Sequence, residues 1–137
     1  MRFSAASAIA FCLAALPATA QTANLFLGSW ACQHSMEPYS GNAYDKHFWE
    51  YQMNVAPDGS WQMSGMYYNP VTGQTAMQGG GSWQPQSGAP SADFQGEYWL
   101  ANGSVAPYTV VYTAADQRNL YLQFRGHSHI QNATCQR

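Results

Sequence analysis

The stretch HFWEYQMNVAPDGSWQMSGMYY, residues 47–68, holds two runs of alternating apolar and polar residues joined by a tight turn. In the first run, residues 47–55, most alternate side chains are large and apolar or aromatic, and the residues between them are mostly polar. A period of two is typical of a strand with one buried face. Pro57-Asp58-Gly59 has the composition of a hairpin turn. The stretch therefore predicts two antiparallel strands, 47–55 and 60–68.

The same pattern continues toward both ends of the chain. Short alternating runs at intervals of about ten residues are typical of an all-β sandwich or barrel. Within one run, Gly79-Gly80-Gly81 suggests a bulge or a sharp bend. Because each run follows the last after a short connection, we expect an eight-stranded antiparallel up-and-down barrel. Besides 47–55 and 60–68, the expected strands are 27–34, 74–84, 93–100, 108–113, 120–124 and 127–135.

Residues 1–20 have the three parts of a secretory signal peptide. Met1-Arg2 is basic, residues 3–16 are apolar apart from small residues, and Pro17-Ala18-Thr19-Ala20 offers small residues for cleavage. The apolar run is too short to span a membrane, and a short buried N-terminal helix is the alternative interpretation. We expect cleavage near Ala20, one barrel domain over 21–137, and a periplasmic or secreted protein without a membrane anchor.

Charged residues are scarce and aromatic residues are abundant, at 9% and 15% of the chain. The five Lys and Arg side chains stand against seven Asp and Glu, so the net charge is −2. A protein with so few cations is a poor partner for nucleic acid or for anionic membranes. The aromatic content predicts a folded core rather than a disordered chain.

Two of the three cysteines, Cys32 and Cys135, remain once the leader and its Cys12 are removed. In an oxidising compartment this pair predicts a disulfide, whereas a redox pair or thiolate metal site usually needs close spacing such as C-x-x-C. The two cysteines fall on the first and last expected strands, so the bond would lock the seam of a closed barrel. In the chain-entropy model a loop of this length contributes roughly 4–5 kcal/mol. Antiparallel pairing of the cysteines would also set Trp30 opposite Arg137.

Gly28-Ser29-Trp30, on the first expected strand, resembles the G-x-W opening of the lipocalins and of the wider calycin superfamily. The chain is similar in size to the small bacterial lipocalin-like domains. This resemblance implies that Trp30 closes the barrel floor under an arginine from the end of the chain, either Arg137 or Arg125. The avidin branch is not expected to apply, because Cys32 stands where its ligand-binding asparagine would be.

No residue occupies a recognisable catalytic setting. A serine or cysteine nucleophile needs an oriented base within reach. The serines lie in no nucleophile elbow, and both mature cysteines are assigned to the disulfide. We therefore expect neither enzyme activity nor a cofactor. Carboxylates fall mostly on polar faces, where a solvated surface is the simpler interpretation; they are Asp45, Glu50, Asp93 and Glu97.

His127 and His129 share one face of an expected strand and are the best metal candidates, with His34 and His47 the other histidines. Imidazole and methionine thioether together suit Cu(I), which makes a copper-binding periplasmic protein the third functional hypothesis. Methionines at inward positions, however, commonly fill irregular core space. The sequence therefore predicts no metal site.

The apolar face of the expected barrel is the main functional lead. An eight-stranded barrel is either filled by side chains or holds one small ligand. Large aromatic residues favour the first outcome, and tyrosines beside glycines favour the second. The first hypothesis is an exported lipocalin-like binding protein for a small apolar or aromatic ligand. The candidate cavity-lining residues are Trp49, Tyr51, Met53, Trp61, Met63, Tyr67, Met77, Trp83, Tyr98, Tyr108 and Tyr112.

The second hypothesis is an exported interaction protein, such as a protease or lysozyme inhibitor. Small disulfide-closed barrels of this kind present a loop or an N-terminal segment to the target enzyme. The candidate loop spans residues 37–45 and contains Pro38, Tyr39 and Tyr44. This hypothesis rests on size and compartment, which is analogy.

Mass spectrometry of the exported protein tests the disulfide expectation. Alkylation before and after reduction should show that both mature thiols, Cys32 and Cys135, are blocked, because an oxidising compartment favours the bond. Two freely alkylated thiols in the native protein would contradict closure of the barrel by a disulfide.

Overall fold

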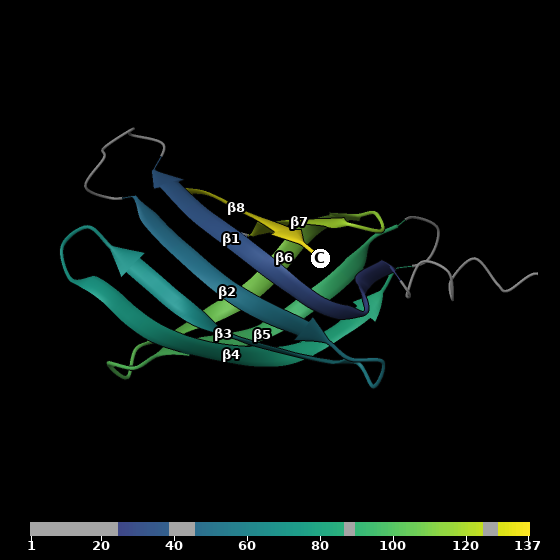
Figure 1. Ribbon diagram of the computed structural model, residues 1–137, viewed down its shortest axis with the longest axis horizontal. Coiled ribbons are helices and arrows are strands. Elements are labelled where there is room, and N and C mark those ends of the chain that lie inside the picture. Colours follow the sequence, from purple (N-terminus) through teal and green to yellow (C-terminus); the bar gives the residue numbers. More distant parts are fainter. Residues whose placement is uncertain (1–24, 39–45, 87–89, 125–128) are drawn as a thin grey trace, which may run out of the picture.

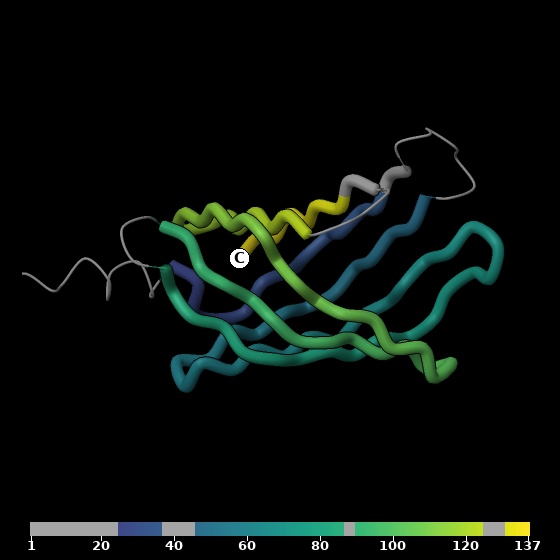
Figure 2. The backbone as a smooth tube through the Cα atoms, turned by 180° about the vertical axis from the view of Figure 1, so that it is seen from behind, coloured from purple at the N-terminus to yellow at the C-terminus, as the bar shows by residue number. Residues whose placement is uncertain are grey.

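The computed structural model describes residues 25–38, 46–86, 90–124 and 129–137, so the expected leader lies outside the described residues. Each strand pairs with the next in antiparallel fashion, and β1 also pairs with β8, which closes the barrel (Figures 1 and 2). The predicted eight-stranded up-and-down barrel is confirmed. The strands are β1 Gly28–Pro38, β2 His47–Val55, β3 Ser60–Asn69, β4 Gly73–Pro85, β5 Ala92–Leu100, β6 Val105–Ala115, β7 Asn119–Phe124 and β8 His129–Gln136.

The seam between β1 and β8 carries the disulfide. Cys32 lies directly opposite Cys135 in the antiparallel ladder, and their sulfur atoms are bonded. The predicted disulfide is confirmed. β1 extends four residues beyond the predicted strand, so Glu37 and Pro38, expected in a loop, pair with Ile130 and His129 instead. Within the described part of the chain, no helix is long and apolar enough to cross a membrane.

The interior follows from the period-two alternation. On β2 the burial alternates along the strand, with Trp49, Tyr51, Met53 and Val55 buried and the residues between them exposed. Tyr112 breaks the expected pattern. A bulge in β6 shifts the register between Val110 and Tyr112, so Tyr112 points outward and is 54% exposed. The prediction that Tyr112 lines the interior is therefore wrong.

Inward-facing glycines let neighbouring strands approach closely. A Cβ on Gly96 would overlap the carbonyl oxygen of Gly80 and come within 2.8 Å of the Trp61 ring. At Gly65, an added Cβ would overlap the backbone of β2. The three glycines at 79–81 cause no bulge, because β4 pairs with β3 and β5 in unbroken register through them. Glycine there removes side-chain volume without interrupting the ladder.

One end of the barrel, the closed end, is plugged by Phe26 and Trp30, both fully buried. The Trp30 indole N–H donates to the Phe26 carbonyl oxygen at 2.8 Å. Arg137 lies over the Trp30 ring, with its guanidinium carbon 4.3 Å from the ring centroid. The guanidinium also donates to the carbonyl oxygens of Leu27 at 2.6 Å and Gln117 at 2.7 Å. Arg137 thus joins the segment before β1 to the turn before β7.

We expect Arg137→Ala to lower the free energy of unfolding by about 1–3 kcal/mol, because it removes charge-assisted hydrogen bonds and a cation–π contact. Urea unfolding of the oxidised protein measures this change. Arg118→Ala is the matched control, because its hydrogen bonds in the structure use the backbone N–H and C=O alone. It should change stability by less than about 0.5 kcal/mol. Equal stability of the two variants would contradict the bracing role of Arg137.

Candidate functional site

The end of the barrel opposite Trp30 holds an aromatic group centred on His34. In the sheet, His34 lies opposite Trp49, and Trp49 lies opposite Tyr67. The His34 ring is stacked between Trp49 and Phe124, at centroid distances of 4.4 Å and 4.3 Å. Tyr98 meets the edge of Trp49 at 6.4 Å. These five residues, His34, Trp49, Tyr67, Tyr98 and Phe124, are called the His34 cluster.

Two buried ring nitrogens of the His34 cluster make no hydrogen bond of ordinary length and angle within the described residues. They are Nε2 of His34 and Nε1 of Trp49, and both side chains are 4% exposed. An unpaired buried polar group of this kind costs about 1–3 kcal/mol. Such groups are rare in folded proteins, and each points to a missing partner such as a water or a ligand.

The other three buried tryptophans show what Trp49 lacks. The indole N–H donates to a backbone carbonyl oxygen in each of them: Trp30 to Phe26, Trp61 to Ser82 at 3.0 Å and Trp83 to Ala56 at 2.7 Å. Further inside the barrel, the hydroxyls of Tyr51 and Tyr108 bond each other at 2.9 Å. In the described part of the chain, the buried side-chain polar atoms without a partner are therefore confined to the His34 cluster.

The His34 cluster is uncharged at neutral pH. Burial lowers the pKa of His34 to about 3, and the neighbouring Gln131 side chain only partly opposes this shift. Burial also raises the pKa of Tyr98; the nearby Tyr67 reinforces this shift, and a weak hydrogen bond with the Trp49 indole opposes it. A neutral imidazole beside the neutral phenol of Tyr98 favours an uncharged ligand, because burying an unpaired charge is costly.

The rim of this end is held by hydrogen bonds to Tyr67. Its hydroxyl is bonded to Nδ1 of His47, and Nδ2 of Asn69 lies 3.2 Å away. The His47 and Tyr67 rings also stack at 5.6 Å. Tyr67, Tyr98 and Met36 are only partly buried, unlike the plug at the closed end. The described residues at this end thus combine an ordered rim with partial access to solvent.

The predicted cavity-lining residues divide between three levels of the barrel. Trp83 packs against Phe26 at the closed end, at a centroid distance of 6.2 Å. Trp61 and Tyr108 pack against each other in the middle, at a centroid distance of 4.5 Å. Of the predicted residues, Trp49, Tyr67 and Tyr98 belong to the His34 cluster. Met53, Met63 and Met77 are buried in the core.

His34 and Phe124 were not predicted to lie in a ligand site, although both hold inward positions of alternating runs. His34 stands two residues after Cys32 and shares its face of β1. The sequence signal that could have identified this site was His34, a polar residue at an inward position among aromatic residues. The carboxylates Glu50 and Glu97 are exposed and Asp93 is partly buried, whereas Asp45 and Arg125 lie outside the described residues.

The metal and inhibitor hypotheses depend mostly on residues outside the described part of the chain. Among the described residues, no three His, Cys, Asp or Glu side chains are grouped as metal ligands would be. His127 and the side chain of His129 are not described, and neither are residues 39–45 of the candidate inhibitory loop.

Comparison with known proteins supports the fold. A de novo designed fluorescence-activating β-barrel is similar in structure, with a TM-score of 0.52 and 11% sequence identity. The similarity covers 85% of this chain and 96% of the designed one. No protein-family model matches the sequence, and no curated protein matches it significantly.

The stability of the protein should fall as the pH drops below 6.5, and His34 should cause part of this fall. The unfolded chain protonates His34 near pH 6.5, whereas the folded protein holds its pKa near 3, so the unfolded state binds more protons between these values. The slope from this group approaches about 1.4 kcal/mol per pH unit.

Urea unfolding at pH 7, 6, 5 and 4.5 measures this dependence. His34→Phe keeps a flat ring between Trp49 and Phe124 and should flatten the slope. Above pH 4 the carboxyls of Asp58 and Asp116 contribute little, because hydrogen bonds lower their pKa values below the ordinary 3.8. An unchanged slope in His34→Phe would show that His34 is not held neutral by burial.

Proposed function

We propose that this barrel binds a small, neutral ligand with an aromatic or apolar body at the His34 cluster. The observation that carries the proposal is the pair of buried, unpaired ring nitrogens on Trp49 and His34. A ligand with an acceptor oxygen would pair with the Trp49 N–H, and a ligand polar group would pair with His34 Nε2. Binding would thereby recover the free energy that the empty site loses.

The packing of the interior supports a site near the partly buried end of the barrel rather than deep within it. The closed end is plugged by Phe26 and Trp30, and the buried rings of Trp61 and Tyr108 pack together in the middle. Ligand sites are commonly apolar, with a few convergent polar groups that set orientation. The His34 cluster has this composition, and its partly buried tyrosines offer flat surfaces against which a ring can stack.

The proposal includes export and membership of the calycin-like binding barrels. The disulfide is compatible with an oxidising compartment, and residues 1–20 have the pattern of a signal peptide. Gly28-Ser29-Trp30 under Arg137 supports the calycin likeness. The structural neighbour is described as fluorescence-activating, a property of that designed barrel that is compatible with a small-molecule site in this architecture.

A binding titration with prodan, a neutral naphthalene that carries a carbonyl acceptor, tests the site. The native protein should shift the probe emission to the blue. Trp49→Phe should weaken binding about three- to tenfold, because one hydrogen bond is worth roughly 0.5–1.5 kcal/mol. Trp83→Phe is the matched buried control and should bind prodan as the native protein does. No binding of prodan, or equal affinity in both variants, would contradict the proposal.

The same two variants separate binding from stability. Trp83→Phe deletes a hydrogen bond of 2.7 Å, whereas Trp49→Phe deletes an unpaired donor. The empty Trp49→Phe protein should therefore lose less free energy of unfolding than Trp83→Phe, by about 1 kcal/mol. Native mass spectrometry of protein purified from its own compartment should in addition reveal a retained small molecule.

A further inference from the structure

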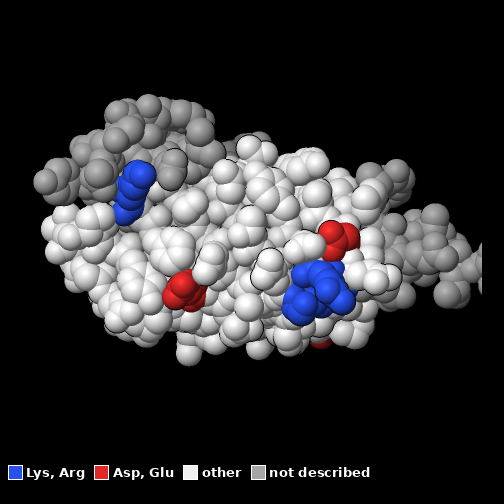
Figure 3. Space-filling model, turned by 45° about the horizontal axis from the view of Figure 1, so that its top comes forward, with Lys and Arg blue, Asp and Glu red and all other residues white. Residues whose placement is uncertain are grey.

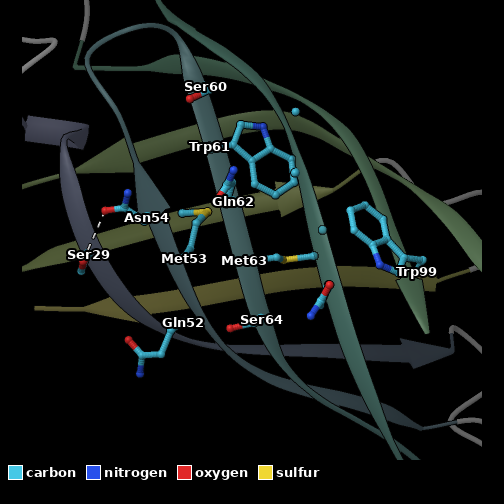
Figure 4. A pocket seen from close by; sticks show the side chains of 14 residues that line it. Ser29, Gln52, Met53, Asn54, Ser60, Trp61, Gln62, Met63, Ser64 and Trp99 are labelled. Carbon is cyan, nitrogen blue, oxygen red and sulfur yellow. Dashed lines mark hydrogen bonds between the residues drawn. The ribbon is translucent and has the colours of Figure 1, made fainter. Parts of the chain in front are cut away.

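The outer surface of the barrel carries a hollow of about 810 Å³ over β2, β3 and β4. Figure 4 shows it from close by, with Trp99 at one side and the side chains of β2 and β3 across from it. None of its lining residues is ionisable. Its outward side chains are amides, hydroxyls and one indole: Ser29, Gln52, Asn54, Ser60, Gln62, Ser64, Gln78 and Trp99.

The strand register explains how these side chains come together. Gln52 lies opposite Ser64, Ser64 opposite Gln78, and Gln78 opposite Trp99, so one row crosses four strands. In the adjacent row Asn54 lies opposite Gln62, and Gln62 opposite Gly80. Because Gly80 has no side chain at an outward position, the surface is depressed between Gln62 and the next strand.

Trp99 is unlike the other tryptophans of this protein. It is 44% exposed, whereas the other four are buried. Within the described residues its indole makes no ring contact or hydrogen bond. The side chains of Gln52, Gln62 and Gln78 likewise make no hydrogen bond to a described protein group. The hollow therefore presents an aromatic face and several amide groups that are free to bind.

We propose that this hollow is a binding site for a neutral oligosaccharide. The face of a sugar ring has polarised C–H groups that pack on the electron-rich face of an indole. A sugar hydroxyl is both a donor and an acceptor, and a carboxamide is both as well. No residue that lines the hollow is ionisable, and the exposed residue opposite Gly80 on β5 is the acidic Glu97, so an anionic ligand is disfavoured. The proposal does not depend on the His34 cluster, which faces the interior.

The site extends beyond a single sugar unit. A second hollow, of about 390 Å³, shares Ser64, Gln78 and Trp99 with the first. Trp99 therefore lies between two depressions of the same surface. A chain that stacks one ring on Trp99 would place its neighbouring units in the hollows on either side. On another face of the barrel, which Figure 3 shows, charged residues are also few.

Calorimetric titration of the oxidised protein with cellohexaose, maltohexaose and chitohexaose tests the proposal. At least one should bind with a Kd below about 1 mM, and its monosaccharide should bind at least about tenfold more weakly. Trp99→Ala should weaken hexasaccharide binding at least about tenfold, because it removes the stacking surface. Gln78→Ala should weaken it severalfold. A hexamer of galacturonic acid, which is anionic, should not bind.

Two control variants locate the binding. Tyr112→Ala removes another outward aromatic residue, 54% exposed on β6, and should leave hexasaccharide affinity unchanged. Trp49→Phe alters the interior and should also leave it unchanged, so failure of this site and failure of the His34 cluster are distinguishable. The proposal is overturned if none of the three neutral hexasaccharides binds, if Trp99→Ala binds as the native protein does, or if Trp49→Phe alone abolishes binding.

Discussion

The pairing of β1 with β8 is the constraint on which the rest of this structure depends. It turns a meander with two free edges into a barrel with none, and so satisfies the backbone hydrogen-bonding groups of both terminal strands. Cys32 and Cys135 fix the register of this one pairing. In that register Arg137 reaches Trp30, and His34 faces the interior next to Trp49. Both the plug at one end and the His34 cluster at the other are therefore consequences of the seam.

The two ends of the barrel differ in whether their buried polar atoms have hydrogen-bond partners. At the closed end each indole N–H meets a carbonyl oxygen, and Arg137 binds backbone carbonyls on both sides of the seam. At the His34 cluster the two unpaired nitrogens lie among rings that otherwise pack well. A protein that kept such atoms without a partner would lose stability for no gain. The difference between the ends is thus the strongest functional signal in the molecule.

Much of the fold was predictable because alternation and cysteine placement are local signals. The period of two in residues 47–68 marks inward residues directly, and two cysteines leave one pairing. The bulge at Val110 and Tyr112 was not predictable, because the run around it has no glycine or other break. Its position depends on how β6 meets β7 across the barrel.

The candidate sites were less predictable, because they depend on which partners a side chain finds. Trp49 and Trp83 both hold inward positions in alternating runs, so the sequence does not distinguish them. Only the folded chain shows that the Trp83 indole meets a carbonyl oxygen and the Trp49 indole does not. Trp99 did carry a signal, since it is out of phase with the inward Tyr98 and Leu100. The hollow beside it depends on the register of four consecutive strands, from β2 to β5.

Closure between β1 and β8 also has a consequence for the order of folding. The two cysteines are separated by 103 positions, so the first strand finds its second neighbour only when the last strand has been made. Until then β1 has one unpaired edge, which is a template for pairing with another chain. Contacts of such long range are slow to form. Pairing of β8 with β1 is therefore the contact that the chain completes last in synthesis, and until it forms the aromatic face of the sheet stays open.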